Sequence, residues 1–319
     1  MPTRRGFLQS SAVVAAALSG TGSALATDAM PSPSPSFPVT TPPKAASQIQ
    51  VPKMKFFHAE ISRLVLGVNP FCGYSHYNNN YSGVMKEWYT ADRVCAVMHQ
   101  CTRFGINAFN YVALERLPQD WLQFVAEGGQ MHLIMQVLSD ANETTALAKG
   151  LKPLAMFRQG EIVDRAFIAG KMSAIREWCK VVRDMGIIVG VGTHKPEVIS
   201  QVEEEGWDVD FYAGCVYNRT RTVDEWKRLL SGEITEMPHE IYLQSDPARM
   251  YGVMRQTAKP CLAFKILAAG RVDDSGVEQA FRTAFSSIKP NDGVIVGMFP
   301  RGKDEVRENA EIVHRVLLG

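Results

Sequence analysis

Short apolar runs alternate with amphipathic stretches along most of the chain. Eight runs have the polar or glycine boundaries that are typical of buried strands: 64–67, 106–110, 133–137, 162–168, 187–191, 209–216, 262–267 and 294–296. Strands that alternate with helices predict a parallel sheet. Eight such units favour a closed (β/α)8 barrel of the α/β class over an open, doubly wound sheet.

The stretches between these runs carry apolar residues at helical spacing. Thr90 is a residue type that caps helices, and the apolar residues from Val94 to Cys101 share one face after it. Similar faces run along 175–185 and 277–288. No Gly-x-Gly-x-x-Gly sequence follows an early run, which argues against a Rossmann domain.

Length and charge narrow the class of function. The chain has 319 residues, 46% of them hydrophobic, which is enough for one large barrel domain. Its 34 lysines and arginines balance its 33 aspartates and glutamates, so there is no basic surplus to suit nucleic acid or anionic lipid. The composition therefore favours a small-molecule substrate.

The N-terminus has the features of an export signal. Arg4 and Arg5 precede an apolar run at 12–18, and small residues lead to a cleavage position after Ala26. The paired arginines resemble the twin-arginine signal, whose translocation machinery carries folded proteins, often with a cofactor bound. The run is too short for a stable membrane span. Residues 1–26 are therefore predicted to be a cleaved signal peptide and the protein to be periplasmic or secreted.

A biased segment follows the signal. Residues 27–54 are rich in proline, serine, threonine and alanine, which predicts a disordered linker. The barrel is then expected to occupy residues 55–319.

The six cysteines are scattered along the chain. None has the paired spacing of a zinc site, so no metal site is predicted from them. Disulfides remain open in an oxidising compartment, although most of these cysteines lie in apolar stretches and are interpreted as small core residues.

The closing segment, residues 293–309, combines a strand with a candidate anion site. Gly297 ends a β-branched run and lets the backbone turn or approach a ligand closely. Arg301 and Lys303 follow in a loop, and the N-terminal amides of the next predicted helix would lie beside them. The segment either binds an anionic group or is a solvated turn that closes the barrel.

In a (β/α)8 barrel the reactive groups lie where strands end, so polar residues just after each apolar run are candidates. They are Asn69, Tyr74, His76, Asn110, Tyr111, Gln136, Asp140, Lys171, Thr193, His194, Tyr217, Asn218, Arg219 and Lys265.

Three of these candidates have side chains that could act as an acid, a base, a nucleophile or a ligand. His194 follows a glycine-containing strand end and is either an acid, base or ligand near neutral pH or a loop histidine. His76 lies in a polar loop and has the same two interpretations. Lys265 lies among apolar residues, so it is either a base, Schiff-base former or phosphate ligand, or half of an ion pair between strands. We expect His194 and Lys265 to face one cavity.

Several motifs resemble the aldo/keto reductase superfamily: Arg63-Leu-Val-Leu-Gly67, Gly105-Ile-Asn-Ala-Phe-Asn110, Val294-Ile-Val-Gly297 and Arg307-Glu-Asn309. The resemblance implies a barrel whose closing segment holds the adenosine phosphate end of NADP or NAD. The residues that would then bind the cofactor are Gly297, Arg301, Lys303, Arg307 and Asn309.

The catalytic tetrad of that family is not matched. Asn110 stands where the family has aspartate, Gln136 stands where it has lysine, and no histidine lies near Ala169 after the fourth run. A tyrosine partner is missing too, since Tyr111 is too close to Asn110. Asn110 and Gln136 stay candidate site residues, but the usual proton relay of hydride transfer is not expected.

Three hypotheses for function follow. The first is an exported, aldo/keto-reductase-like enzyme, linked to NADP or NAD, that acts on a carbonyl or sugar. The second is a cofactor-free or metal-assisted lyase, isomerase or hydrolase of carbohydrate, with His194, His76 and Asp140 as acid, base or metal ligands. The third is a binding barrel without chemistry.

Overall fold

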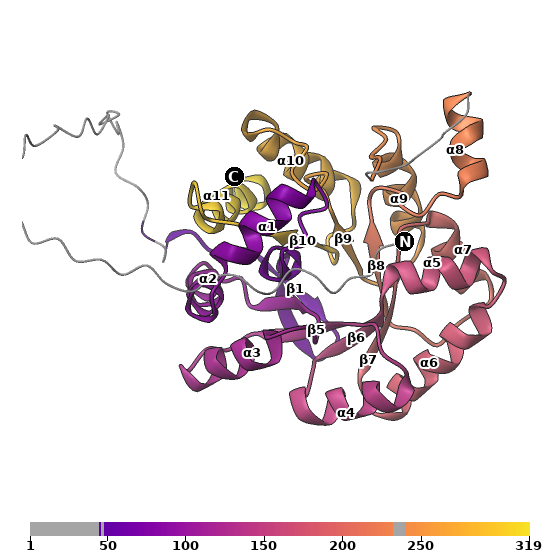
Figure 1. Cartoon of the computed structure of the whole chain (residues 1–319), viewed down its shortest axis with the longest axis horizontal. Coiled ribbons are helices and arrows are strands. Elements are labelled where there is room, and N and C mark those ends of the chain that lie inside the picture. Colours follow the sequence, from indigo (N-terminus) through magenta and orange to yellow (C-terminus); the bar gives the residue numbers. More distant parts are fainter. Residues whose placement is uncertain (1–44, 46–47, 232–239) are drawn as a thin grey trace, which may run out of the picture. The chain divides into compact units, whose positions relative to one another are not determined.

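The computed structural model describes residue 45, residues 48–231 and residues 240–319. They build a closed barrel of parallel strands in the order β10-β3-β4-β5-β6-β7-β8-β9, with helices around it (Figure 1). The strands are β3 (Leu64–Gly67), β4 (Ala108–Tyr111), β5 (His132–Val137), β6 (Ala155–Arg158), β7 (Ile188–Thr193), β8 (Phe211–Cys215), β9 (Cys261–Phe264) and β10 (Gly293–Gly297). The predicted (β/α)8 barrel is confirmed.

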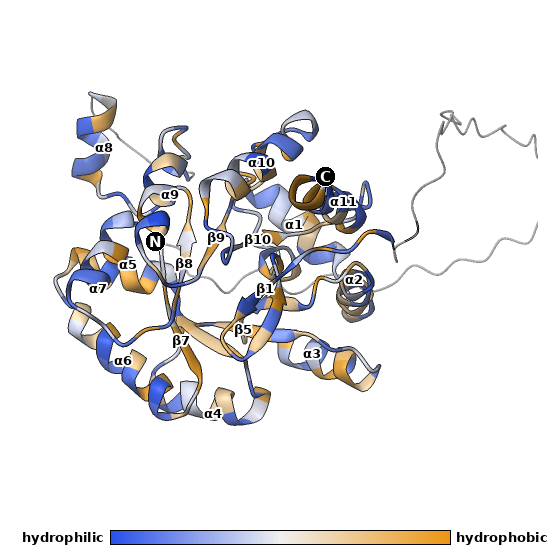
Figure 2. Ribbon diagram, turned by 180° about the vertical axis from the view of Figure 1, so that it is seen from behind, coloured by the Kyte–Doolittle hydropathy of each residue, from blue (hydrophilic) through white to orange (hydrophobic). Residues whose placement is uncertain are grey.

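The helices lie between the strands in sequence. They are α1 (Asn79–Trp88), α2 (Ala91–Arg103), α3 (Leu117–Ala126), α4 (Ala141–Leu151), α5 (Gly160–Ile168), α6 (Met172–Asp184), α7 (Pro196–Glu204), α8 (Val223–Leu230), α9 (Asp246–Gln256), α10 (Val277–Ser287) and α11 (Glu305–Leu318). Thr90 caps α2 as predicted, since its side chain accepts a hydrogen bond from Arg93 N. Figure 2 shows mixed hydrophilic and hydrophobic colours along helices such as α6, as an outer, half-buried layer requires.

A hairpin of β1 (Lys53–Phe56) and β2 (Ala59–Ser62) packs under the N-terminal end of the barrel. Phe56 is fully buried, and its ring lies 5.3 Å from that of Phe211, the first residue of β8. The inward side chains of the barrel, such as Val65 and Ile134, belong to the same apolar cluster. The lower end of the barrel is therefore filled, and polar groups collect at the opposite, C-terminal end.

The fourth strand was predicted in the wrong place. Residues 162–168 form most of α5, whose first turn is capped by the side chain of Gln159. The fourth barrel strand is instead β6, a run of only four residues. Both segments are apolar, and the longer one also has helical spacing, so pattern alone favoured it. Lys171 consequently lies at the start of α6 and not at a strand end.

The predicted linker ends earlier than expected. Ile49 and Val51 are buried in the core, and Lys53 begins β1, so residues 48–54 belong to the folded unit. The predicted signal peptide and the rest of the linker lie outside the described residues, except for residue 45.

Two general features bear on the earlier expectations. All six cysteines are free and buried, as their interpretation as core residues requires. None of the helices in the described part of the chain has the length and apolar character needed to cross a bilayer.

Candidate active site at the barrel mouth

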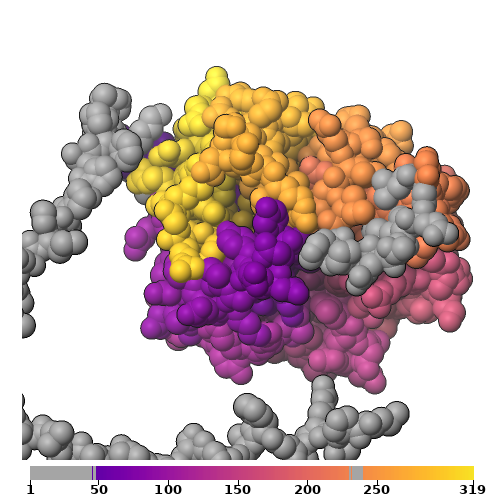
Figure 3. Space-filling model, turned by 45° about the horizontal axis from the view of Figure 1, so that its top comes forward, coloured from indigo at the N-terminus to yellow at the C-terminus, as the bar shows by residue number. Residues whose placement is uncertain are grey.

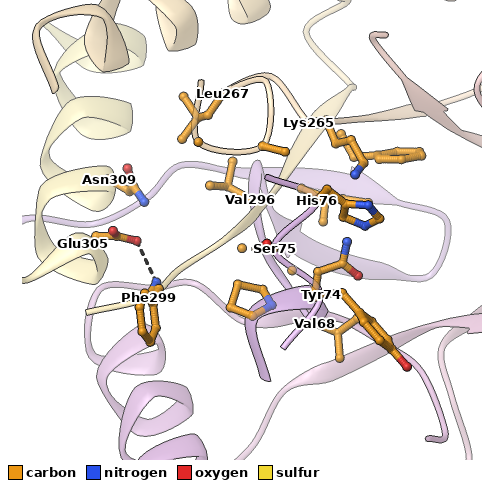
Figure 4. Close-up of a pocket in the computed structure, with 18 of the residues that line it drawn as sticks. Val68, Tyr74, Ser75, His76, Lys265, Leu267, Val296, Phe299, Glu305 and Asn309 are labelled. Atoms are coloured by element: carbon orange, nitrogen blue, oxygen red, sulfur yellow. Dashed lines mark hydrogen bonds between the residues drawn. The ribbon is translucent and has the colours of Figure 1, made fainter. Parts of the chain in front are cut away.

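A cavity of about 320 Å³ opens at the C-terminal end of the barrel, and we call it the mouth cavity. Its size suits a small molecule. The polar side chains that line it are Asn69, Tyr74, Ser75, His76, Tyr81, Asn110, Gln136, Lys265, Asp274, Lys303, Glu305, Glu308 and Asn309. Lys265 and His76 lie at its inner end, while Glu305 and Asn309 lie at its outer end (Figure 4).

Segments from both ends of the chain form this cavity. The segment after β3 supplies Asn69 to Tyr81, and the segment after β10 supplies Phe299 to Asn309. In the space-filling view, the purple and yellow surfaces of these two parts meet on one face (Figure 3). The contact begins in the barrel wall, because β10 pairs with β3 and closes the sheet.

Gly297 stands at that junction for a packing reason. A Cβ on Gly297 would lie 2.6 Å from Pro70 Cδ, and one on Gly67 would lie 2.7 Å from Gly297 N. Neither distance is tolerable for a side chain. The glycine that was predicted to approach a ligand therefore lines the cavity, but close packing of β3 and β10 already requires it.

Lys265 follows β9 directly and points into the inner end of the cavity. Its side chain is only 8% exposed, and its backbone has φ 63°, a left-handed conformation that is uncommon for lysine. Its Nζ lies 3.3 Å from the Tyr242 hydroxyl and 4.0 Å from Glu240 Oε2. Among the described residues, this distant carboxylate is its only acidic partner.

Glu240 is already engaged by other groups. Arg219 Nε donates to Glu240 Oε2 at 2.5 Å, and the Tyr242 hydroxyl donates to the same oxygen at 2.8 Å. The other oxygen accepts from His76 Nδ1 at 2.7 Å. Little of this negative charge is left for Lys265, and Arg271 adds a positive charge by stacking on the Tyr242 ring at 4.1 Å.

These surroundings favour a neutral amine. Burial lowers the pKa of Lys265 well below its usual range, and the positive charge of Arg219, followed by that of Arg271, lowers it further. A neutral lysine amine carries a free electron pair and is a nucleophile. Sequence reasoning left Lys265 as either reactive or paired, and the geometry favours the reactive interpretation.

His76 also lines the inner end and also has a left-handed backbone, with φ 54°. Burial is the largest cause that lowers the pKa of His76 to about 2, and the positive charge of Arg219 acts in the same direction. Its contact with Glu240 is therefore a hydrogen bond from a neutral imidazole and not an ion pair. His76 orients Glu240, and its lowered pKa disfavours the first of its two interpretations, an acid or base near neutral pH.

His194 lies outside the cavity lining, in contrast to the expectation that it shares a cavity with Lys265. Its side chain is 4% exposed, and Nδ1 donates to Asp164 Oδ2 at 2.7 Å. Arg219 Nη1 donates to Nε2 at 3.1 Å. Burial lowers the pKa of His194, and Asp164 opposes that shift. With both nitrogens used, His194 holds Arg219 in place.

Two amide side chains complete the inner end. Asn110, at the end of β4, is 7% exposed, and its Nδ2 has no hydrogen-bond acceptor among the described residues. Gln136 lies on the neighbouring strand β5 and also lines the cavity. Both residues were predicted from strand ends. A buried donor without a partner costs about 1–3 kcal/mol, which a ligand oxygen would recover.

Asp140 does not join these groups. It caps α4 and accepts from the backbone nitrogens of Asn142 and Glu143 at 2.9 and 3.0 Å. The expected trio of His194, His76 and Asp140 is therefore not brought together. No group of three or more histidine, cysteine, aspartate or glutamate side chains in the described residues is arranged to hold a metal ion.

Of the five predicted cofactor-binding residues, some line the cavity and others lie outside it. Gly297, Lys303 and Asn309 line it. Arg301 and Arg307 do not: Arg301 is exposed beyond the cavity, and Arg307 Nη1 lies 3.1 Å from Glu311, with its guanidinium over the Phe104 ring. The two arginines expected at a phosphate therefore face other surfaces.

The charges that remain do not fit the phosphates of NADP or NAD. Lys303 already pairs with Asp274 at 2.6 Å and with Glu308 at 2.7 Å. Glu305 adds a third carboxylate, and its Oε2 accepts from Phe299 N at 2.7 Å (Figure 4). Phosphate sites in proteins offer cations and free backbone amides. At the outer end of the cavity, the described carboxylates Asp274, Glu305 and Glu308 outnumber the one described lysine, Lys303.

Sequence reasoning missed several residues that shape this site. In the sequence, Glu240 and Tyr242 are far from any strand end, because they belong to the long connection between β8 and β9. Arg271 lies in another loop, after β9. Asp164 was missed because its segment was taken for a strand. Arg219 was noted only as one polar residue among many after β8. The one feature of the sequence that could have indicated these residues is their charge or polarity within long loops after the strands.

No protein-family model matches the chain, and no curated protein matches it. A truncated 3-deoxy-D-arabino-heptulosonate 7-phosphate synthase from Thermotoga maritima is similar, with 12% identity over 85% of this chain and 95% of that one and a TM-score of 0.49. A structure of Gox0644 in its apo form has 11% identity over 83% and 88% and a TM-score of 0.49.

A sugar phosphate isomerase/epimerase from Parabacteroides distasonis has 12% identity over 79% of this chain and 92% of that one, with a TM-score of 0.42. Likenesses at these identities and TM-scores say nothing about which reaction this chain performs. The aldo/keto reductase resemblance likewise gains no support from a family match. What is established is that the chain is an eight-stranded parallel α/β barrel.

Proposed function

We propose that this chain is an enzyme that acts on a small carbohydrate with a carbonyl group, as a lyase or isomerase that uses the amine of Lys265. One observation carries the proposal: a buried amine lines the mouth cavity, and the only described carboxylate that pairs with it is 4.0 Å away and held by other groups. Left-handed backbones at both Lys265 and His76 support it, because strained conformations cluster at functional sites.

The first step would be condensation of the amine with the carbonyl. The electron pair of Nζ adds to the carbonyl carbon, and the carbonyl oxygen takes up protons and leaves as water. Overall, one amine, one carbonyl and one proton give one protonated imine and one water. Tyr242 is the group placed to relay these protons, since its hydroxyl lies 3.3 Å from Nζ.

The protonated imine then acts as an electron sink. The electron pair of a bond at the adjacent carbon moves toward nitrogen, and either a proton or a carbonyl fragment is released. Proton release leads to isomerisation, and carbon–carbon cleavage is lyase chemistry. Reprotonation and addition of water return the free amine of Lys265. No other cofactor is required for these steps.

The amides of Asn110 and Gln136 would hold the substrate for this chemistry. They line the same cavity as Lys265, and the Nδ2 of Asn110 has no acceptor among the described residues. An amide donor that is already buried loses little on meeting a hydroxyl or carbonyl oxygen. Neutral amides also recognise hydroxyl groups without drawing in charged competitors.

The reductase linked to NADP or NAD is the weaker proposal. It rests on the family resemblance, whose tetrad is replaced by Asn110 and Gln136. It also requires a phosphate at the outer end of the cavity, where the lining is acidic. We therefore assign no step of the reaction to a dinucleotide.

Reductive trapping tests the proposal. The purified protein is incubated with low concentrations of glycolaldehyde, dihydroxyacetone or D-erythrose and a borohydride reductant, and intact mass is recorded. Hydride addition to an imine leaves a stable secondary amine, so one adduct per chain is expected with at least one compound. If no compound gives a saturable single adduct, the amine mechanism is wrong.

We also propose that the protein works outside the cytoplasm, as the predicted signal at residues 1–26 suggests. Replacing Arg4 and Arg5 together by lysine should hold the precursor in the cytoplasm. Periplasmic yield from fractionated cells measures this, and an unchanged yield would rule out the twin-arginine route.

A further inference from the structure

The mouth cavity changes character along its length. The inner end offers one amine and neutral amides, whereas the outer end offers Asp274, Glu305 and Glu308 around Lys303. Figure 4 shows Lys265 and Glu305 at opposite ends of the same cavity. A substrate that reaches from one end to the other would therefore meet two different sets of groups.

Lys303 does not make the outer end positive. Its Nζ lies 2.6 Å from Asp274 and 2.7 Å from Glu308, so two carboxylates share one ammonium group. Glu305 adds a third carboxylate to this end of the cavity, and burial raises its pKa. A phosphate or carboxylate brought here would be repelled by these neighbours and would have to displace one from Lys303.

The inner end of the cavity is no better suited to binding an anion. Arg219 and Arg271 are near Lys265, but neither lines the cavity, and both are held by Glu240. Their charges lower the pKa of the lysine instead of reaching a ligand. The ionisable groups that do line this end, Lys265 and His76, both have lowered pKa values.

The outer lining suits hydroxyl groups. Carboxylates are strong acceptors for hydroxyl donors, and Asn309, which is 3% exposed, adds an amide beside them. The wall next to these groups is aromatic: Tyr81 and Phe299 line the cavity, with ring centroids 5.7 Å apart. Aromatic faces with polar acceptors beside them match the alternating C–H and O–H surfaces of a sugar.

We propose that the site takes a neutral, unphosphorylated sugar, with its carbonyl carbon at Lys265 and its hydroxyl chain extending toward Asp274, Glu305 and Glu308. This proposal rests on the amine chemistry proposed above and names the substrate class for it. The site selects against phosphorylated sugars by charge, because the described lining offers them no free cation at the outer end.

The test uses a matched pair of substrates, D-erythrose and D-erythrose 4-phosphate, which differ only in the phosphate. Trapping rates are measured with the same reductant for wild type, Glu308→Gln and Glu311→Gln. Wild type should trap the neutral sugar at least about tenfold faster at subsaturating concentration, the ratio expected from roughly 1.4 kcal/mol of repulsion.

The two variants separate this site from general surface charge. Glu308→Gln frees part of the charge of Lys303 and should raise the trapping rate of the phosphate compound several-fold. Glu311→Gln removes the same charge one turn away, where Glu311 pairs with Arg307 outside the cavity, and should leave the ratio unchanged.

The outcomes are distinguishable. Equal rates for the two sugars, or faster trapping of the phosphate, would overturn the neutral-sugar proposal while leaving the role of Lys265 intact. A Glu308→Gln variant with the wild-type ratio would also overturn it. Failure to trap either sugar, or any of the simpler aldehydes, would refute the proposed function itself.

Discussion

The ends of β7 and β9 place ionisable side chains at the same edge of the barrel, but the two sets of side chains differ in their hydrogen-bond and ion-pair partners. After β7, His194 hydrogen-bonds through both ring nitrogens, and Lys195 Nζ lies 3.2 Å from both carboxylate oxygens of Glu225. After β9, the described polar partners of Lys265 Nζ are the Tyr242 hydroxyl at 3.3 Å and Glu240 at 4.0 Å. Burial does not by itself mark a reactive group. A buried ionisable group marks a reactive site when it lies beside a cavity and lacks close hydrogen-bond or charge partners.

The largest expected effect comes from replacing each of the two buried lysines, Lys265 and Lys195, by methionine. Lys265→Met should abolish reductive trapping completely, because it removes the nucleophile. Lys195→Met should keep trapping but lower the melting temperature, because it removes the buried ammonium group that pairs with Glu225. Intact mass and thermal melts on both variants check this. Equal trapping by Lys265→Met and wild type would mean that another amine reacts.

The next largest effect is on stability at the end of β7. Asp164 is fully buried and accepts from Thr193 Oγ1, Thr220 Oγ1 and His194. Asp164→Ala should therefore cost about 3–5 kcal/mol in the free energy of unfolding, measured in urea. The control Asp208→Ala breaks an exposed pair with Arg183 and should cost less than about 1 kcal/mol. Similar losses in both variants would show that Asp164 is not a structural anchor.

A smaller effect is expected from the proton relay. Tyr242→Phe removes the hydroxyl near Lys265 but keeps the ring under Arg271, so the trapping rate should fall about a hundredfold with little change in stability. Tyr77→Phe is the control, since its ring also lies under Arg271 whereas the hydroxyl that contacts Lys265 is that of Tyr242. Unchanged trapping by Tyr242→Phe would assign the proton transfer to another group.

Much of the fold could be predicted from the sequence, because short β-branched and apolar runs that alternate with amphipathic stretches are typical of a parallel α/β barrel. The start and close of the barrel, at β3 and β10, were predicted within a residue or two. The fourth strand was missed because its three apolar residues gave a weaker pattern than the helix after them. A short strand is specified by its neighbours in the sheet, which pattern analysis does not include.

The site was only partly predictable for a similar reason. Lys265, Asn110 and Gln136 were predicted from their places in or after the strands, and all three line the mouth cavity. His194 was expected to be reactive, but its partner Asp164 comes from α5, and that contact exists only in the folded barrel. Arg307 was assigned to a ligand by resemblance, although one turn of helix decides which way it points.

The pH dependence is the smallest of the expected effects. Only the neutral amine attacks a carbonyl, so the trapping rate should rise with pH through the lowered pKa of Lys265 and then level off. Arg271→Gln removes one of the charges that lower this pKa and should move the midpoint of the rate profile upward. A rate profile for both proteins measures the shift, and a downward shift would contradict the assigned role of Arg271.

Stability should show the same titration with a defined sign. Between its lowered pKa and the ordinary lysine range, Lys265 is neutral in the folded chain and protonated in the unfolded chain. The unfolded state then binds more protons, so this residue makes the free energy of unfolding rise with pH across that window. Lys265→Met should lack that slope, which urea titrations at several pH values can detect.

The most direct single measurement is to locate the trapped adduct in the chain. Wild-type protein is trapped with D-erythrose at low occupancy, digested, and mapped by tandem mass spectrometry. The adduct should sit on Lys265, with Lys195 and the exposed lysines unmodified at the same sugar concentration. An adduct spread over surface lysines, or concentrated on any residue other than Lys265, would contradict the assignment of Lys265 as the reactive amine.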